Sequence, residues 1–431
     1  MPASLSAADL FTAVFAVALL AGLAIKFWLT GRQIRHVARH RDHVPQAFAQ
    51  TVTPAAHRKA ADYTIAKSRF GLLEMAFGAA VLLGWTLLGG LNLLNALLLH
   101  VFGPGLLQQL ALLAAFALIG GLLELPFSLY QTFVIEQRFG FNRMDGRLWL
   151  ADLAKSTLVG ALVGLPIAAL ILWLMGAAGP RWWLWAWLAW MGFNLVLLMV
   201  YPSFIAPLFN RFQPLRDETL AARVTTLMRR CGFAAKGLYV MDGSRRSAHA
   251  NAYFTGFGAA KRVVFYDTLL ARLSPDQVDA VLAHELGHFR HRHIVQRIVL
   301  MFALSLAGFA LLGWLSGQSW FYAGLGVQPS MAVLADGRAA PNDALALLLF
   351  LLAVPVFGFF VAPLSAQLSR RHEFQADAFA AAQTSGADLS GALLKLYEDN
   401  ASTLTPDPVY VRFYYSHPPA SERLARLQPA A

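Results

Sequence analysis

Leu282-Ala283-His284-Glu285-Leu286-Gly287-His288-Phe289 contains two histidines four positions apart, with a glutamate directly after the first. In an α-helix, residues i and i+4 lie on one face, so both imidazoles can reach a single zinc ion. The glutamate between them is placed to accept a proton from a zinc-bound water, which is the HExxH pattern of metallopeptidases. This stretch therefore predicts a zinc site with His284 and His288 as ligands and Glu285 as the catalytic base.

The residues before this stretch have the features of a helix start. Ser274 can act as the N-cap, Pro275 occupies the first helical position, and Gln277 lies three residues after the cap. Apolar residues then recur at helical spacing, which places both histidines on a helix. The five-residue pattern also occurs in helices that bind no metal, and on the pattern alone that alternative stays open.

The composition is typical of a membrane protein. Of the 431 residues, 57% are hydrophobic and 14% charged, whereas soluble domains carry about 25% charged residues. Apolar runs long enough to cross a hydrocarbon core of about 30 Å predict a mainly α-helical protein with seven transmembrane helices. The runs are Leu10–Leu29, Phe70–Leu99, Leu106–Val134, Leu153–Met175, Trp182–Tyr201, Ile294–Leu315 and Ala344–Leu364.

Lysine and arginine are distributed unevenly among the connections between these runs. They concentrate in every second connection, including 206–293, and in the C-terminal segment 369–431, whereas the alternate connections contain only Arg181 and Arg338. Basic connections favour the cytoplasm, so the N-terminus is expected outside and both polar segments inside. The net charge of +11 is therefore a topology signal, and no nucleic-acid-binding motif accompanies it.

The runs divide the chain into four parts. Residues 1–205 are expected to form the first five membrane helices, and 294–368 the last two. The polar segment 206–293 contains the HExxH helix, and the segment 369–431 is expected to supply a further ligand to the same metal. Short β-strands are predicted in the polar segment, around Gly237–Met241, Asn251–Phe254 and Arg262–Tyr266.

A catalytic zinc usually has three protein ligands and keeps one position for water. Glu373, on a predicted helix after the last apolar run, is the candidate for the third ligand. Asp377, one turn later, can accept the free N–H of a ligand histidine. His291 and His293 are expected to be interfacial helix residues, because three ligands along one helix do not converge easily on one ion. An exposed, arginine-rich helix is the alternative for the region around Glu373.

With these residues the chain resembles the type I CAAX prenyl endopeptidases, the integral-membrane zinc proteases that process prenylated proteins. The resemblance covers nearly the whole chain, because four further segments match: Thr132–Asn142, Tyr201–Asn210, His249–Phe254 and Tyr415–Arg423. It implies seven transmembrane helices in a ring around an internal, water-filled chamber, with a small α+β zinc metalloprotease domain capping the ring on the cytoplasmic side. It also implies one zinc ion per chain, held by His284, His288 and Glu373.

The resemblance also implies a substrate site. Asn251 and His417 match positions that bind the substrate backbone, and Ala252 follows Asn251 in a strand that can pair with an extended peptide. His417 can in addition donate a hydrogen bond to the developing oxyanion, although a turn residue before two prolines is the alternative. Arg423 is assigned either to substrate binding or to anchoring the C-terminal tail on acidic partners.

The predicted function is therefore cleavage of peptide bonds by a zinc-dependent endopeptidase embedded in the lipid bilayer. Its substrate is expected to be a peptide or protein, with a prenylated CAAX C-terminus as the favoured case and no nucleic acid as partner. The alternatives are a general quality-control protease for membrane proteins and, less favoured, a transporter with a structural zinc. The composition and the absence of a lysine-rich retrieval signal in Gln428–Ala431 favour a bacterial inner membrane over the endoplasmic reticulum.

Overall fold

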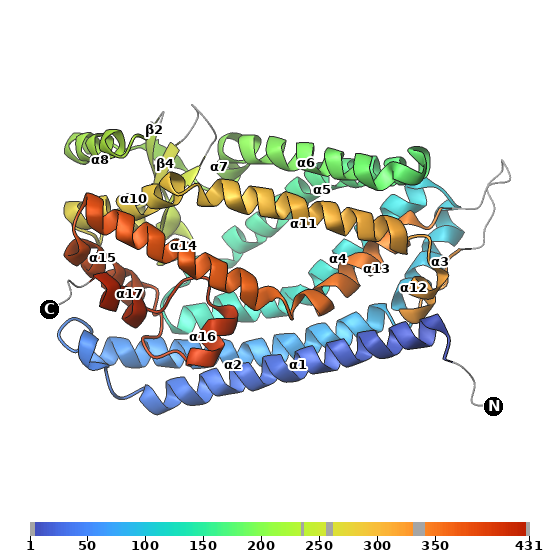
Figure 1. Cartoon of the computed structure of the whole chain (residues 1–431), viewed down its shortest axis with the longest axis horizontal. Coiled ribbons are helices and arrows are strands. Elements are labelled where there is room, and N and C mark those ends of the chain that lie inside the picture. Colours follow the sequence, from blue (N-terminus) through green and yellow to red (C-terminus); the bar gives the residue numbers. More distant parts are fainter. Residues whose placement is uncertain (1–4, 234–236, 256–261, 331–340, 428–431) are drawn as a thin grey trace.

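The computed structural model describes residues 5–233, 237–255, 262–330 and 341–427, so Gln428–Ala431 lies outside the described residues. Long helices run along the molecule, and a small sheet with short helices lies at one end of them (Figure 1). The long helices are α1 Ala7–His40, α2 Pro54–Trp85, α4 Leu106–Tyr130, α5 Gly146–Ala177, α6 Trp182–Val200, α11 His293–Leu315, α13 Asp343–Gly358 and α14 Ala362–Gln383.

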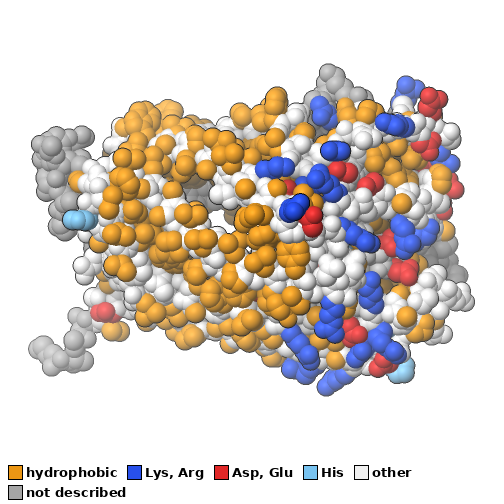
Figure 2. All heavy atoms as spheres, turned by 180° about the vertical axis from the view of Figure 1, so that it is seen from behind, with side chains coloured by type: hydrophobic (Ala, Val, Ile, Leu, Met, Phe, Trp, Pro, Cys, Tyr) orange, Lys and Arg blue, Asp and Glu red, His pale blue; other side chains and the backbone are white. Residues whose placement is uncertain are grey.

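Up to seven segments of the described chain can cross a membrane. Five are single runs of helix, and two are helix pairs bent at a short break: α2 with α3 (Gly90–Phe102), by 50°, and α13 with α14, by 68°. On the face that Figure 2 shows, hydrophobic side chains cover most of this helical part, whereas charged side chains gather at the end that carries the sheet. The predicted seven-helix membrane fold with a small α+β unit at one end is confirmed.

The two bent spans depart from the predicted apolar runs. Helix α2 begins at Pro54, well before the run that starts at Phe70, and it ends before Gly89, which has a positive φ of 81°. The last apolar run is divided between α13, which contains Pro355, and α14. A left-handed glycine and a proline both interrupt regular helix, which explains why continuous hydropathy is not continuous helix here.

The small unit contains a four-stranded sheet of order β1-β2-β4-β3. The predicted strands are present as β2 Gly237–Met241, β3 Ala252–Thr255 and β4 Arg262–Tyr266. Strands β2 and β4 are parallel, and β3 pairs antiparallel with β4 at the edge of the described sheet. The short strand β1, Phe212–Pro214, is not among the predicted strands, because three residues ending in proline carry no strand periodicity.

Helix α10, Pro275–Arg290, carries the HExxH residues and starts as predicted. The Ser274 side chain accepts a hydrogen bond from the Gln277 backbone, and the Gln277 side chain accepts one from Ser274 N, which completes a capping box. Its buried face, including Leu282 and Leu286, packs into the core formed by the sheet and by α8, Glu218–Arg230. The core therefore fixes which face of α10 is left for the histidines.

The C-terminal tail folds back against the first membrane helix. Asp407 accepts a hydrogen bond from Arg32 Nη2 of α1 at 2.9 Å, and its backbone N–H donates to Gln33 Oε1 at 2.7 Å. These contacts fix the segment that leads to His417. The shorter α-helices are α7 Ala206–Phe209, α9 Asp267–Leu270, α12 Ser319–Gly324, α15 Gly386–Asp399, α16 Pro408–Tyr414 and α17 Ala420–Leu427.

Candidate metal centre

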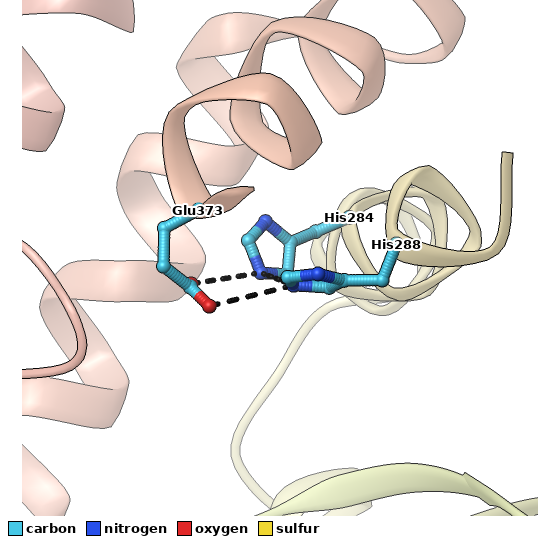
Figure 3. A group of neighbouring side chains, drawn as sticks. All are labelled: His284, His288 and Glu373. Carbon is cyan, nitrogen blue, oxygen red and sulfur yellow. Dashed lines mark hydrogen bonds and ion pairs between the residues drawn. The ribbon is translucent and has the colours of Figure 1, made fainter. Parts of the chain in front are cut away.

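Two imidazoles from α10 and one carboxylate from α14 converge at one point (Figure 3). The Nε2 atoms of His284 and His288 are 3.3 Å apart, and they lie 3.4 and 3.5 Å from the two carboxylate oxygens of Glu373. One donor atom from each residue lies within 4.8 Å of the others. The structure therefore brings together the three side chains that the sequence predicts as ligands.

The close approach of α10 and α14 depends on Gly287. A Cβ atom at this position would lie 2.9 Å from Ala376 Cα and 3.1 Å from Ala376 O, both backbone atoms of α14. Real Cβ atoms do not come so close to a backbone, so any larger residue would push the two helices apart. Glycine in the HExxH stretch is thus the residue that lets Glu373 reach the histidines.

We expect Gly287→Ala to destabilise the protein by about 1–3 kcal/mol, the usual cost of overpacking. The measurement is the thermal unfolding midpoint of the purified protein in detergent. Gly160→Ala on α5 is the matched control, because no atom lies within 4 Å of a Cβ built there. Equal midpoints for Gly287→Ala and the control would show that the helices do not need this contact.

The three side chains form a donor set suited to a cation. Glu373 is 2% exposed, and its buried Oε2 atom, 3.4 Å from His284 Nε2, accepts no hydrogen bond from the residues that the structure describes. A buried carboxylate oxygen without a partner is costly, and a bound cation would compensate it. Two imidazole nitrogens and a carboxylate are the ligands that catalytic zinc sites use, and they leave one position open. The residues present therefore fit a metal ion.

The pKa shifts of the two histidines also fit a bound metal ion. Burial acts to lower the pKa of His284, but the contacts with the Asp377 and Glu373 carboxylates outweigh it and raise the pKa to about 9. Burial, followed by the charge on His284, lowers the pKa of His288 to about 3. The two carboxylates therefore favour a positive charge at His284, and a metal cation bound there would supply one.

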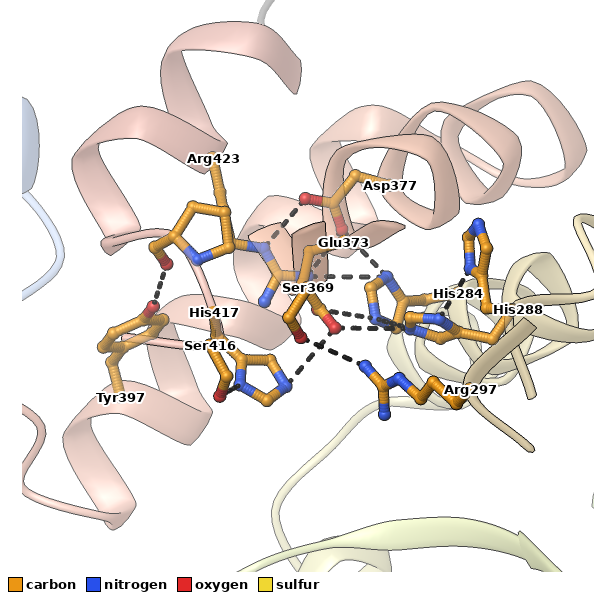
Figure 4. A network of polar contacts seen from close by, with 12 residues as sticks. His284, His288, Arg297, Ser369, Glu373, Asp377, Tyr397, Ser416, His417 and Arg423 are labelled. Atoms are coloured by element: carbon orange, nitrogen blue, oxygen red, sulfur yellow. Dashed lines mark hydrogen bonds and ion pairs between the residues drawn. The ribbon is translucent and has the colours of Figure 1, made fainter. Parts of the chain in front are cut away.

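His284 is oriented by a buried ion pair (Figure 4). Asp377 Oδ1 lies 2.9 Å from His284 Nδ1, and the Arg423 guanidinium donates to both oxygens of Asp377, at 2.8 and 2.5 Å. Asp377 can therefore accept the Nδ1–H of His284, which leaves Nε2 free for a metal. Arg423 anchors the tail helix α17 on this carboxylate. A role of Arg423 in substrate binding stays a prediction.

His288 is oriented by His293. His293 is 1% exposed, and its Nδ1 lies 3.0 Å from His288 Nδ1 while its Nε2 lies 2.8 Å from Gln375 Oε1. His293 begins the membrane helix α11, so its interfacial position stays a prediction, but its side chain is buried at the site because α10 ends at Arg290 and Arg292 adopts a left-handed φ of 57°. That turn directs His293 back toward the site, and no periodicity in the sequence signals it.

The remaining candidates surround the cluster. His417 Nε2 lies 3.4 Å from Glu373 Oε1, and Glu285 lines the same cavity of about 240 Å³ as Asn251 and Ala252. Burial raises the pKa of Glu285, which favours its use as a proton acceptor near neutral pH. The Asn251 side chain accepts a hydrogen bond from Ala252 N at 2.8 Å, at the start of the edge strand β3.

Fold and site together define a multi-pass membrane protein of the metalloendopeptidase class. Two family models match the chain, "CAAX prenyl protease N-terminal, five membrane helices" over residues 33–211 and "Peptidase family M48" over residues 214–431. The chain belongs to the M48 peptidase family, among its CAAX prenyl protease members. It is an integral-membrane metalloendopeptidase, and this assignment argues against the transporter alternative.

Relatives match over most of the chain. CAAX prenyl protease 1 of Saccharomyces cerevisiae is 32% identical, with 95% of this chain and 93% of the relative covered. The human homolog of CAAX prenyl protease 1 is 31% identical, and the match covers 96% of this chain and 95% of the relative. The crystal structure of S. mikatae Ste24p superposes with a TM-score of 0.89 at 28% identity, covering 97% of this chain and 99% of that one. These relatives are eukaryotic, so the expectation of a bacterial source is not borne out.

Proposed function

We propose that this protein is a zinc-dependent endopeptidase whose substrates carry a prenylated CAAX C-terminus. The observation that supports it most is the convergence of His284, His288 and Glu373 next to Glu285 and the edge strand β3. The names of the relatives, CAAX prenyl protease 1, support the substrate class. The unit that carries the site is proposed to face the cytoplasm, in line with the basic connections at that end.

The metal would be held by Nε2 of His284, Nε2 of His288 and the Glu373 carboxylate, with Asp377 and His293 fixing the two imidazoles. A zinc ion bound there supplies Lewis-acid polarisation of a water molecule and of the scissile carbonyl. Three protein donors are typical of a catalytic zinc, whereas a structural zinc usually has four.

The chain's own residues would carry the other parts of the reaction. The Glu285 carboxylate accepts a proton from the attacking water and passes it to the leaving amine. The edge that β3 forms in the described sheet pairs with an extended peptide, which holds the scissile bond beside the cluster. Asn251, at the start of that strand, and Ala252 contact the peptide backbone. His417 Nε2 donates a hydrogen bond to the oxygen on which negative charge develops.

Removing the contact between His288 and His293 is expected to weaken metal binding. Replacing His293 by alanine leaves His288 without the partner that fixes its tautomer, and such changes typically cost about 10–100-fold in metal affinity. The measurement is zinc affinity by competition with a chelator. His291→Ala is the control, because His291 is an exposed neighbour at the end of α10. An unchanged affinity in His293→Ala would contradict the proposed orienting role.

The substrate class is tested by comparing two peptides of the same sequence. Purified protein should cleave a farnesylated CAAX peptide faster than its unprenylated counterpart, and a chelator should stop both reactions. Equal rates for the two peptides would favour the general quality-control protease instead. No chelator-sensitive cleavage of either peptide would contradict the proposed function.

A further inference from the structure

Three cavities meet at His417, whose side chain lines all of them. The middle cavity, of about 240 Å³, contains His284 and Glu373. A second cavity, of about 840 Å³, extends between α11 and α14; all three metal ligands line it, together with apolar side chains that include Leu300, Met301 and Leu304. A third cavity, of about 670 Å³, lies among α2, α15 and the tail segment 401–419.

Residues 249–254, which run into β3, line the three cavities one after another. Phe254 lines the apolar cavity, Asn251 lines the middle cavity, and His249 lines the third. Antiparallel pairing is the more stable way to add a strand to the edge of β3. A peptide bound in that direction runs opposite to β3, so its C-terminal residues lie beside Asn251 and His249. The third cavity is therefore placed to receive the residues that follow the scissile bond.

The charged side chains on the wall of the third cavity are cations, and the carboxylates that they contact lie outside its lining. No Asp or Glu is among the described residues that line it, and its permanently charged side chains are Lys67 and Arg423. Arg423 is already bound through two hydrogen bonds to Asp377. The ammonium of Lys67 donates to the Tyr63 hydroxyl at 3.2 Å and lies 3.7 Å from the Glu136 carboxylate. An ammonium has three N–H donors, so Lys67 retains capacity for another anion.

The contact with Glu136 leaves N–H donors of Lys67 for another anion. The oxygen nearest to Lys67, Oε1, already accepts hydrogen bonds from the Tyr63 hydroxyl at 2.6 Å and from Gln131 at 2.8 Å. Lys67 is 46% exposed at its side chain, toward a cavity that also contains several tyrosines. A tyrosine hydroxyl has one O–H donor, which Tyr63 gives to Glu136 and Tyr397 gives to the Pro418 carbonyl, so the other tyrosines of the wall are the ones that offer hydrogen bonds to an anion. The tyrosines that line it are Tyr63, Tyr397, Tyr410, Tyr414 and Tyr415.

We propose that this third cavity binds the free C-terminal carboxylate of the substrate, with the Lys67 ammonium as its counter-ion. The inference rests on the proposed function and names the part of the substrate that the cavity recognises. With the bond after the prenylated cysteine as the proposed scissile bond, a CAAX C-terminus has three residues beyond it, which extend about 10 Å as a strand. Lys67 thereby selects substrates that end shortly after the scissile bond, while the apolar cavity, which the three metal ligands also line, lies along Phe254 at the other end of the same stretch of chain.

The test uses the full-length protein and two farnesylated peptides that differ only in a free carboxylate or an amide at the C-terminus. Release of the C-terminal tripeptide is followed by mass spectrometry to give kcat/KM. Wild-type protein should prefer the carboxylate by about tenfold, as expected for one charge-assisted contact at a half-exposed site. Lys67→Met should remove the preference by slowing only the carboxylate peptide, and Lys67→Arg should retain it.

Lys59→Met is the matched control, because Lys59 lies on the same helix with its ammonium over the ring of Phe141 and does not line the cavity. Lys59→Met should keep the wild-type preference for the peptide with a free carboxylate. If wild-type protein cleaves both peptides equally, the carboxylate site is overturned while the proposed function stands. The carboxylate site is also overturned, and the proposed function still stands, if Lys67→Met slows the cleavage of both peptides equally. If wild-type protein cleaves neither peptide, the proposed function fails, and the carboxylate site fails with it.

Discussion

Glu285→Gln is expected to abolish peptide cleavage while zinc remains bound. Glu285 is not one of the three converging donors, so its replacement leaves the ligand set intact. The amide of glutamine cannot accept a proton from water, and loss of a general base typically costs about 10²–10⁴-fold in rate. The measurement is the cleavage rate of a farnesylated CAAX peptide, with the zinc content determined on the same sample.

Glu218→Gln is the control for Glu285→Gln, because Glu218 is an exposed carboxylate in the first turn of α8, outside the cavities at the metal site. It should leave the cleavage rate and the zinc content unchanged. Normal turnover by Glu285→Gln would refute the role of Glu285 as the base. Loss of zinc in that variant would instead assign Glu285 to metal binding.

Arg423→Met is expected to have the largest effect on stability. The Arg423 and Asp377 side chains are 6% and 4% exposed, and the substitution leaves the carboxylate buried beside His284 without its main counter-ion. Removing one partner of a buried ion pair typically costs about 3–5 kcal/mol. The measurement is the thermal unfolding midpoint in detergent, together with zinc affinity, since Asp377 also orients His284.

Two further variants separate the ion pair from general packing of the tail. Arg426→Met, on the same helix, removes an exposed arginine whose guanidinium lies over the Phe374 ring, and it should change the midpoint little. The double variant Arg423→Met/Asp377→Asn should recover part of the lost stability, because no buried charge is left unpaired. An Arg423→Met midpoint equal to that of Arg426→Met would show that the ion pair does not hold the tail.

The parts of the fold that are predicted correctly depend on local signals. The capping residues around Ser274 and the helical spacing of the apolar residues are sufficient to predict α10, and length and hydropathy are sufficient to predict the membrane helices. The strands β2, β3 and β4 also have local periodicity. The breaks in the bent spans are missed, because they depend on backbone geometry at Gly89 and near Pro355 that hydropathy does not record.

The parts of the site that are missed depend on contacts between distant segments. The need for glycine at 287 arises from Ala376 on another helix, and no feature of the HExxH stretch itself shows it. His293 is buried against His288 only because Arg292 turns the chain. Glu373 is predicted from its neighbourhood and from a family resemblance. The bend between α13 and α14, which carries it to the histidines, is visible only in three dimensions.

The most direct test of the central claim is the zinc content of three purified proteins, measured by elemental mass spectrometry. The wild-type protein and Glu285→Gln should each contain one zinc per chain, whereas Glu373→Ala should lose it, because one of three donors is gone. Stoichiometric zinc of unchanged affinity in Glu373→Ala would contradict the proposed ligand set.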